Sequence, residues 1–310
     1  MYFKAMQAVI AFIMSLVAFF VPQTPASNTS PSFYALTNVN PNAIAEVAAT
    51  QDIKIMTYNV KISGDGLRTV EKRIPLIVET LSKNTPDSFG LQEADKGWVE
   101  GIAAEMADYA HIEKYRDDGI EKGESSAIFY LKDKYDLIES GHFWLSRTPD
   151  VPSKDWDAGH CRICSYVILK DKSTGFTYAH FNTHFDNASA QARTESVALI
   201  SAKIAEIAPD IPVVLTGDFN FSEGSGDYNN LLACGLKDTK YLAEEYDDHA
   251  TYHGYHVIMP DTKPIDFVMV NGYVSSVKSS KIQSGTIDHI FASDHFPIIV
   301  EMTLFNGGNK

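Results

Sequence analysis

One stretch, Val213-Val214-Leu215-Thr216-Gly217-Asp218-Phe219-Asn220, constrains this chain more than any other. Its apolar residues predict a buried strand that stops at two polar side chains. On a strand, Asp218 and Asn220 point the same way while Phe219 turns back into the core. A carboxylate beside an amide at a strand end suits the handling of water, metal ions and phosphate. A plain turn built from Gly, Asp and Asn fits the same residues, so the rest of the chain must decide.

The N-terminal residues form a pattern of their own. Residues 1–26 contain a single charge, Lys4, and an apolar run from Ala8 to Val21. This pattern predicts a signal peptide, with an uncleaved membrane anchor as the alternative, because the run is short for a membrane span. We therefore expect a secreted or extracytoplasmic protein with a flexible linker over residues 27–51, one folded domain over 52–306 and a tail over 307–310. No later segment reads as a transmembrane helix, so no integral membrane domain is expected.

Apolar periodicity divides the folded domain into many strands and few helices. Helices are expected around Ile74–Leu81, Trp98–Ala107 and Ala192–Ile207, the last with Ser189 as its N-cap. Strands are expected over Ile53–Val60, Ser88–Gln92, Tyr109–Glu113, Ser125–Lys132, Asp136–Leu145, Ile163–Lys170, Phe176–Phe185, Ile211–Thr216, Ile265–Val270, Val277–Ile282 and Phe296–Leu304. This order predicts a single α/β domain whose sheets are covered by helices.

Charge and cysteine content narrow the functional classes. The formal net charge of −14 repels long polyanions and so argues against avid non-specific nucleic-acid binding. A local pocket lined by cations or a metal ion can still accept a small phosphate ester. Cys161 and Cys164 have C-x-x-C spacing. However, they lie at the start of a predicted strand, where side chains three positions apart point to opposite faces. We interpret them as packing residues, with a zinc or redox role as the alternative.

Polar side chains close several of the predicted strands: Asn59, Glu93, His184, Asp218, Asn220, Asp266, Asp294 and His295. Each taken alone fits a turn, a helix cap or a core histidine. Taken together they supply hard carboxylate oxygens for Mg²⁺ or Mn²⁺ and two histidines that can move protons or stabilise an anion. The strand ends are therefore where chemistry is expected.

An ordered series of motifs resembles one superfamily. The motifs are Thr57-Tyr58-Asn59, Leu91-Gln92-Glu93, Glu124-Ser125-Ser126-Ala127-Ile128-Phe129-Tyr130, Asn182-Thr183-His184, Gly217-Asp218-Phe219-Asn220, Ile265-Asp266-Phe267 and Ser293-Asp294-His295. Over about residues 52–305 they resemble the endonuclease/exonuclease/phosphatase superfamily, which includes deoxyribonuclease I, apurinic endonucleases, deadenylases, inositol-polyphosphate phosphatases and neutral sphingomyelinases. The segment after His184 is similar to a bacterial exported branch. The resemblance implies a deoxyribonuclease-I-like four-layer sandwich, with two mixed β-sheets packed face to face and helices outside.

The resemblance also implies a metal site and a water-activating site. Glu93 would be the main ligand of Mg²⁺ or Mn²⁺, with Asn59 beside it and Asp294 as a second acidic group. Asp218 would orient or deprotonate the attacking water, and Asn220 would hold a phosphoryl oxygen. Lys61 stands where apurinic endonucleases have an acid, which argues against a second metal near Asn59.

Two histidines and two arginines complete the implied site. Asp266 would align His295, which would act as a base or as a cation against the developing negative charge. Glu124 would pair with His184, placed to contact the phosphate or the leaving oxygen. Further substrate contacts are expected from Arg162, Arg193 and His253, although Arg193 on a helix also fits a surface ion pair.

These observations predict a secreted, Mg²⁺-dependent hydrolase, monomeric, that cleaves a small phosphodiester or phosphomonoester by in-line attack of an activated water. A nuclease acting on DNA or RNA is the main alternative. A sphingomyelinase-like phospholipid hydrolase is a weaker one, because no amphipathic helix or apolar hairpin that would enter a membrane is evident. A binding module that keeps the fold without the chemistry is disfavoured, because none of Glu93, Asp218, Asp266 and His295 is missing.

Overall fold

The computed structural model describes residues 49–64, 66–256, 262–287 and 289–307. The predicted signal peptide lies outside the described residues, as does most of the predicted linker. The elements in order are β1 (Thr50–Asn59), η2 (Gly66–Arg68), α2 (Val70–Asn84), β2 (Ser88–Gln92), α3 (Lys96–Glu105), β3 (Tyr109–Ile112), β4 (Ile128–Leu131), β5 (Tyr135–Trp144), β6 (Ile163–Asp171), β7 (Thr177–His184), α4 (Ala190–Ile207), β8 (Val213–Asp218), α5 (Gly226–Ala233), β9 (Lys237–Asp238), η3 (Thr239–Tyr241), β10 (Ala243–Tyr246), β11 (Asp266–Val270), β12 (Val274–Ile282) and β13 (Ile298–Phe305).

The strands form two mixed sheets. The first has the order β10-β12-β13-β1-β2-β4-β3 and the second the order β5-β6-β7-β8-β11-β9. In the first sheet β1 is parallel to β2 and antiparallel to β13. In the second sheet β7 is parallel to β8, and β8 is antiparallel to β11. The carboxyl ends of β1 and β2, and those of β7 and β8, therefore lie side by side.

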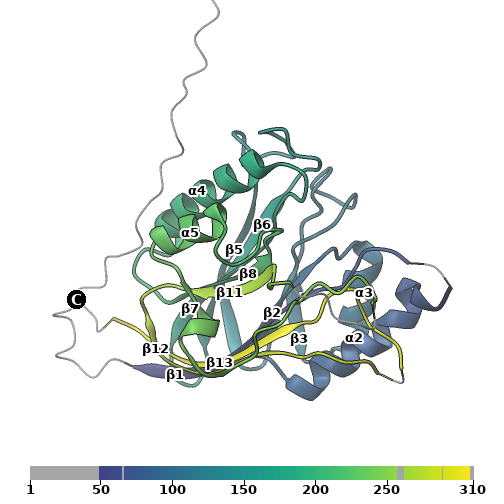
Figure 1. The fold of residues 1–310 in the computed structure, drawn as a ribbon. Helices are drawn as coiled ribbons and strands as arrows, with labels where there is room; N and C mark the ends of the chain where they lie inside the picture. Colours follow the sequence, from purple (N-terminus) through teal and green to yellow (C-terminus); the bar gives the residue numbers. More distant parts are fainter. Residues whose placement is uncertain (1–48, 65, 257–261, 288, 308–310) are drawn as a thin grey trace, which may run out of the picture. The chain divides into compact units, whose positions relative to one another are not determined.

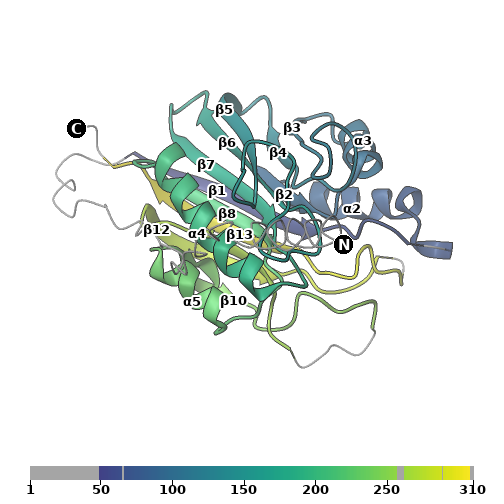
Figure 2. The same ribbon diagram turned by 90° about the horizontal axis from the view of Figure 1, so that it is seen from above.

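The two sheets pack face to face, and helices cover their outer faces (Figure 1). Ile55 and Val300 of the first sheet and Val214 and Val268 of the second belong to one buried cluster, which forms the core between the sheets. A second cluster joins α2 and α3 to the outer face of the first sheet. A third joins α4 and α5 to the second sheet, and Figure 2 looks onto α4 lying over β7 and β8. The predicted four-layer α/β sandwich is confirmed.

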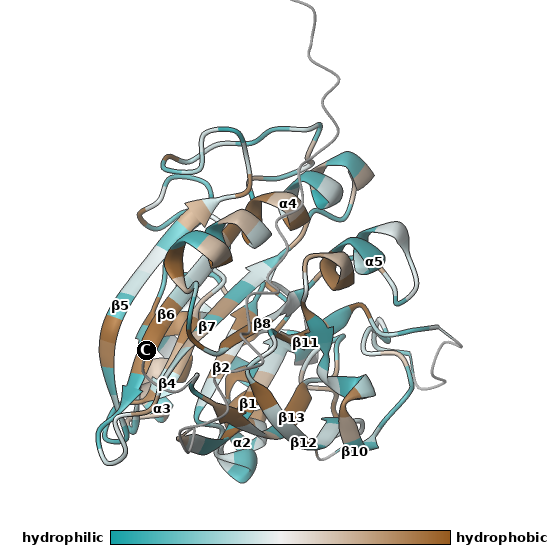
Figure 3. Ribbon diagram, turned by 90° about the vertical axis from the view of Figure 1, so that its left-hand side faces the viewer, coloured by the Kyte–Doolittle hydropathy of each residue, from teal (hydrophilic) through white to brown (hydrophobic). Residues whose placement is uncertain are grey.

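Alternation of apolar and polar residues explains why one face of β13 enters the core. Its eight residues alternate between buried and partly exposed positions, and Val300, Met302 and Leu304 point inward. The central strands β2, β8 and β11 are buried along their whole length, as expected for strands covered on both faces. Figure 3 shows the hydrophobic colouring concentrated in the strands, whereas α4 carries it on part of its surface only.

The structure differs from the predicted elements in several places. Ordered strand β1 begins at Thr50, inside the range assigned to the linker. The region between Thr216 and Ile265 carries α5, β9, η3 and β10, none of which was predicted. These elements are short, and α5 begins at Gly226, after its N-cap Ser225, within a Gly- and Ser-rich stretch that is typical of loops. Cys164 packs in the core between α4 and the second sheet, and all three cysteines are free.

The described residues contain no helix with the length and apolarity needed to cross a membrane.

Candidate active site

Strand pairing brings the polar strand ends to one edge of the two sheets. His184 pairs with Asp218 across β7 and β8, and Asp218 pairs with Asp266 across β8 and β11. Asn59 pairs with Gln92 in the first sheet, so Glu93 follows directly beside it. The backbone of the first sheet continues through β13, which starts just after the Asp294-His295 pair. Residues more than 200 positions apart in the sequence thus meet because of the strand register.

Asp218 lies at the centre of this edge. Its Oδ2 accepts a hydrogen bond from Asn59 Nδ2 at 2.9 Å and lies 3.6 Å from His184 Nε2 and 3.8 Å from His295 Nε2. The residue is 2% exposed. Burial and the neighbouring Asp266 carboxylate raise the pKa of Asp218, which makes it a stronger base than an ordinary aspartate.

Asn220 lies in the turn that ends strand β8. Strand β8 ends at Asp218, and Asn220 has a φ of 51°, in the left-handed region. Its backbone N–H donates to Asp218 Oδ1 at 3.0 Å, which closes a turn, and its Nδ2 donates to the carbonyl of Phe185 at 2.9 Å. Asparagine tolerates this backbone region better than most residues. The turn and the site are thus the same structure.

His295 forms a close pair with Asp266. Its Nδ1 lies 2.8 Å from Asp266 Oδ2, and both side chains are buried. Burial alone lowers the pKa of His295, but the carboxylates of Asp266, Asp218 and Asp294 outweigh it and raise the pKa to about 10. His295 is therefore a cation at neutral pH. The backbone N–H of Asp266 is itself held by Thr251 Oγ1 at 3.3 Å.

His184 has a different environment. Its Nδ1 lies 3.4 Å from Glu124 Oε2, but that oxygen also accepts a hydrogen bond from Arg116 Nη1 at 2.6 Å. Burial and the nearby guanidinium of Arg162 lower the pKa of His184 to about 3, against the opposing effect of Asp218. His184 is therefore neutral at pH 7.

Glu93 and Asp294 face each other across a lysine. The ammonium of Lys61 lies 3.7 Å from Glu93 Oε2 and 3.5 Å from Asp294 Oδ2. Glu93 also accepts hydrogen bonds from the backbone N–H of Ile62 at 3.0 Å and from Asn59 Nδ2 at 3.1 Å. Burial tends to raise the pKa of Glu93, but His184, the N–H group of Ile62 and the Lys61 ammonium hold it below its usual value. Lys61 and Glu93 have φ values of 59° and 56°, so the backbone is strained on both sides of the pair.

Two sets of donors could hold a divalent cation. The ligand atoms of Asp218, Asp266 and His295 lie within 4.8 Å of one another. In that set, however, His295 Nδ1 is already engaged by Asp266. Glu93 and Asp294 present carboxylate oxygens around a position that already attracts one positive charge, that of Lys61. Hard carboxylate oxygens suit Mg²⁺ or Mn²⁺, so this second set fits such an ion better. The amide of Asn59 presents Nδ2 to Glu93, and its Oδ1 accepts the backbone N–H of Lys61.

The three expected substrate contacts occupy different surroundings. Arg162 is 5% exposed, contacts Asp186 and Asn187 at 3.5 and 3.2 Å, and lines a small pocket together with His184. Its Nη1 has no hydrogen-bond partner among the described residues. Arg193 instead donates to the carbonyl of Asp186 and lies 3.7 Å from Asp227.

His253 is buried behind the site. Its ring stacks on Phe296 at 4.2 Å between centroids, and burial lowers its pKa to about 4. Its backbone N–H donates to the carbonyl of Asp294 at 2.9 Å. Its contacts are those of a core histidine.

Arg73 supports the site, and sequence reasoning missed it. The residue is fully buried on α2, and its guanidinium donates to the carbonyls of Val60, Lys61 and Ala292. It thus ties the loop after β1 to the segment that leads to Asp294 and His295. The sequence did contain a pattern that indicates its burial, because Arg73 precedes Ile77 by four residues and so lies on the same buried face of the helix.

A polar layer beneath the site joins the two sheets. Gln92 Nε2 donates to Thr57 Oγ1 at 2.9 Å and to Asn182 Oδ1 at 2.7 Å, and Thr216 Oγ1 donates to the same Asn182 oxygen at 3.0 Å. The Asn182 Nδ2 group donates to two main-chain carbonyls on the side of the first sheet. A Cβ added to Gly90 would lie 2.4 Å from Asn182, so only glycine allows this close approach. The layer sets the spacing between the halves of the site.

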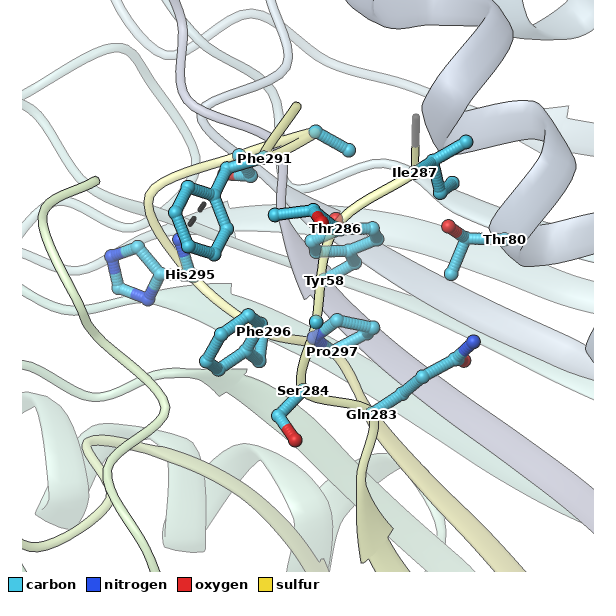
Figure 4. A pocket seen from close by; sticks show the side chains of 13 residues that line it. Tyr58, Thr80, Gln283, Ser284, Thr286, Ile287, Phe291, His295, Phe296 and Pro297 are labelled. Carbon is cyan, nitrogen blue, oxygen red and sulfur yellow. Dashed lines mark hydrogen bonds between the residues drawn. The ribbon is translucent and has the colours of Figure 1, made fainter. Parts of the chain in front are cut away.

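A small pocket adjoins His295. Its volume is about 80 Å³, and it is lined by residues 283–287, 291–293 and 295–297 with Tyr58 and Thr80. Figure 4 shows His295 at one margin, beside Phe291 and Phe296, with Thr80 on the opposite side. This volume suits a few water molecules rather than a substrate.

The chain is similar to proteins of known structure. An endonuclease/exonuclease/phosphatase family protein from Bacteroides thetaiotaomicron is 32% identical, with a TM-score of 0.79, over 83% of this chain and 96% of that one. A mannosyl-6-phosphatase from the same organism is 33% identical, with a TM-score of 0.75, over 81% of this chain and 99% of that one.

A curated relative from Aspergillus niger is a 3′-5′-exoribonuclease subunit, Ccr4, of the CCR4-Not complex. It is 24% identical over 262 residues, which are 69% of this chain and 38% of that protein. The chain spans between 27% and 59% of the length of the curated relatives it matches.

The family model for the endonuclease/exonuclease/phosphatase family matches residues 56–304, from within β1 to near the end of β13. Family members are hydrolases that act on phosphate esters, including nucleic acids. The match includes every residue of the cluster around Asp218, and the resemblance of the motif series is confirmed. The chain belongs to the endonuclease/exonuclease/phosphatase family.

Proposed function

We propose that this chain is an exported, Mg²⁺- or Mn²⁺-dependent phosphoesterase that hydrolyses a small phosphate ester by in-line attack of water. The observation that carries the proposal is the position of Asp218, between a cationic histidine and a neutral one. A base, a fixed positive charge and a carboxylate pair suited to a metal ion are what phosphoryl transfer requires. Export rests on the pattern of residues 1–26 alone.

The protein groups act as follows in this proposal. Asp218 Oδ2, held by Asn59, accepts a proton from the attacking water, whose oxygen forms the new bond to phosphorus as the ester P–O bond breaks. His295, kept protonated by Asp266, faces the negative charge that develops on the phosphoryl oxygens and can return a proton to the leaving oxygen. Neutral His184 exchanges a hydrogen bond with the phosphate or the leaving oxygen without adding charge to the site. Mg²⁺ held by Glu93 and Asp294 would neutralise charge on the phosphoryl group.

A small phosphate ester is favoured over a polynucleotide. The net charge of −14 repels polyanions, and the mannosyl-6-phosphatase resembles this chain over 99% of its own length. A nuclease is the second candidate, because the 3′-5′-exoribonuclease subunit matches 69% of this chain.

A substrate panel with a metal series tests the proposal. The panel contains sugar phosphates, nucleotides, inositol phosphates, phospholipid head groups, plasmid DNA and single-stranded RNA. We expect turnover of small esters with Mg²⁺ or Mn²⁺, abolished by EDTA. Cleavage of nucleic acid that weakens as salt rises would instead favour the nuclease. Absence of turnover of any ester by the metal-loaded protein would refute both.

Glu93→Gln provides the matched test of the metal site, since it removes one negative charge and keeps the side-chain size. Its affinity for Mg²⁺, measured by calorimetry, should fall about 10- to 100-fold, comparable to other losses around metal sites. Glu223→Gln is the control, because Glu223 pairs with Lys240 and not with a residue of the proposed metal site. Equal Mg²⁺ affinity in all three proteins would place the metal elsewhere.

A further inference from the structure

Tyr252 presents an aromatic ring to solvent beside the reacting groups. The residue is 46% exposed, whereas His295 next to it is 4% exposed. The two ring centroids are 5.0 Å apart with the planes inclined by 57°, and the two backbones pair in an isolated antiparallel bridge. In this segment the sequence predicted a substrate contact for His253 and no role for Tyr252.

The backbone around Tyr252 is firmly held. Thr251 O accepts the N–H of Phe296 at 2.8 Å, and Thr251 Oγ1 accepts the N–H groups of Ile265 and Asp266. On the other side, the N–H groups of His253 and Gly254 both donate to the carbonyl of Asp294, at 2.9 and 3.1 Å. The exposed ring is therefore anchored to the same residues that carry the catalytic groups, and binding against it orders little additional chain.

A structural role explains only part of this placement. The ring packs against His295, but nearly half of the residue remains exposed to solvent. A tyrosine needed only for packing would bury its large apolar surface. An ester whose phosphoryl group lies against Asp218 and His295 must extend its organic group out of the buried site. The exposed Tyr252 ring contacts His295 and therefore borders that site.

We propose that Tyr252 is a stacking platform for a ring in the organic group of the substrate, so that the site prefers ring-bearing phosphate esters to acyclic ones. This inference rests on the proposed phosphoesterase function and specifies its substrate class. Sugar rings and nucleobases share the required feature, a broad face that can pack on an aromatic ring. Acyclic esters have no such face, so their binding should not weaken when the Tyr252 ring is removed.

Matched variants separate stacking from support of His295. Tyr252→Phe keeps the ring, and Tyr252→Leu keeps apolar bulk without it. The substrates are a hexose 6-phosphate, a nucleoside 5′-monophosphate and glycerol 3-phosphate as the acyclic control. We expect Tyr252→Leu to lower kcat/KM about tenfold for the ring-bearing esters, mainly by raising KM, as for loss of a base stack. Glycerol phosphate should change less than about twofold, and Tyr252→Phe should behave like the wild type on all three.

The outcomes distinguish this inference from the proposed function. Equal losses on ring-bearing and acyclic esters would show that Tyr252 acts through His295, and unchanged kinetics would also overturn the platform. The relative loss on hexose and nucleoside esters identifies which ring is bound.

Calorimetry in an Asp218→Asn background provides a readout without turnover. Tyr252→Leu should weaken binding of the ring-bearing esters and leave glycerol phosphate unchanged. Ring-dependent binding by a wild-type protein that hydrolyses no ester would refute the proposed function and retain the platform. Binding that does not depend on Tyr252 would refute the platform alone.

Discussion

Two histidines approach the same oxygen of Asp218 from two sides, yet their charges differ. His184 Nε2 and His295 Nε2 lie 3.6 and 3.8 Å from Asp218 Oδ2, and both rings are buried. The pKa of His184 is lowered to about 3, whereas that of His295 is raised to about 10. Burial lowers both pKa values, so it cannot be the source of the difference.

The difference comes from the second neighbour of each ring. His295 Nδ1 has the Asp266 carboxylate to itself at 2.8 Å. Glu124, the acidic neighbour of His184, is shared with Arg116, and Arg162 adds another positive charge nearby. A carboxylate stabilises an imidazolium only where no stronger cation already neutralises it. The site thus assigns a cation to one side of Asp218 and a neutral donor or acceptor to the other.

Removal of the shared carboxylate should have the largest effect. Asp218→Asn should lower kcat about 10³-fold with little change in KM, because the base is lost while both histidines remain. Steady-state kinetics with saturating Mg²⁺ on the best ester of the panel measures this. A variant that retains most of its kcat would remove Asp218 from the role of base.

The two carboxylate partners provide the direct test of the asymmetry. Asp266→Asn should lower kcat about 10²-fold, while Glu124→Gln should cost about tenfold or less. In the wild type, activity should fall at high pH only as His295 loses its proton near a pKa of about 10. Asp266→Asn removes the charge that raises this pKa, so the alkaline limb should move to lower pH. Glu124→Gln should leave the alkaline limb at the same pH. Comparison of the pH–rate profiles of the wild type, Asp266→Asn and Glu124→Gln tests this difference.

Arg116 should help to lower the pKa of His184. Arg116→Gln removes a positive charge and leaves Glu124 to the histidine, so the pKa of His184 should rise by at least about one unit. NMR titration of the ring protons measures it, with the folded state checked by circular dichroism. The His295 resonances serve as the internal control and should move little. An unchanged His184 pKa would mean that burial and Arg162 alone keep that ring neutral.

A third histidine, His180, should affect stability rather than chemistry. It is buried in the polar layer between Ser88 Oγ and Thr216 Oγ1, at 2.8 and 2.9 Å, and burial lowers its pKa to about 3. Below pH 6.5, His180 binds a proton in the unfolded chain but stays neutral in the folded chain. The free energy of unfolding therefore falls as the pH falls from 6.5 towards 3. This loss amounts to about 2 kcal/mol at pH 5. Urea unfolding of wild type and His180→Gln at pH 7 and pH 5 should show this extra loss only in the wild type.

Much of the site was accessible from sequence because its residues close strands. Glu93, His184, Asp218 and Asp266 each stand at the end of an apolar run or at the start of one, and the structure brings all four to one edge. Periodicity identifies such ends without any knowledge of pairing.

Other residues could not be found in this way. Arg116 lies in a turn-rich segment with no periodic pattern, and its importance arises from a contact with Glu124 that only the folded chain creates. The exposure of Tyr252 beside His295 likewise depends on packing between segments more than 40 residues apart.

The sequence by itself determined the α/β class, the alternation that buries one face of each sheet, and the residue types at the strand ends. These are local properties, set by side-chain period and by the few polar residues that interrupt apolar runs. Only the tertiary structure decided which carboxylate faces which histidine, and therefore which ring carries a charge. Protonation depends on neighbours within a few ångströms, and those neighbours are set by strand register and sheet spacing rather than by proximity in the chain.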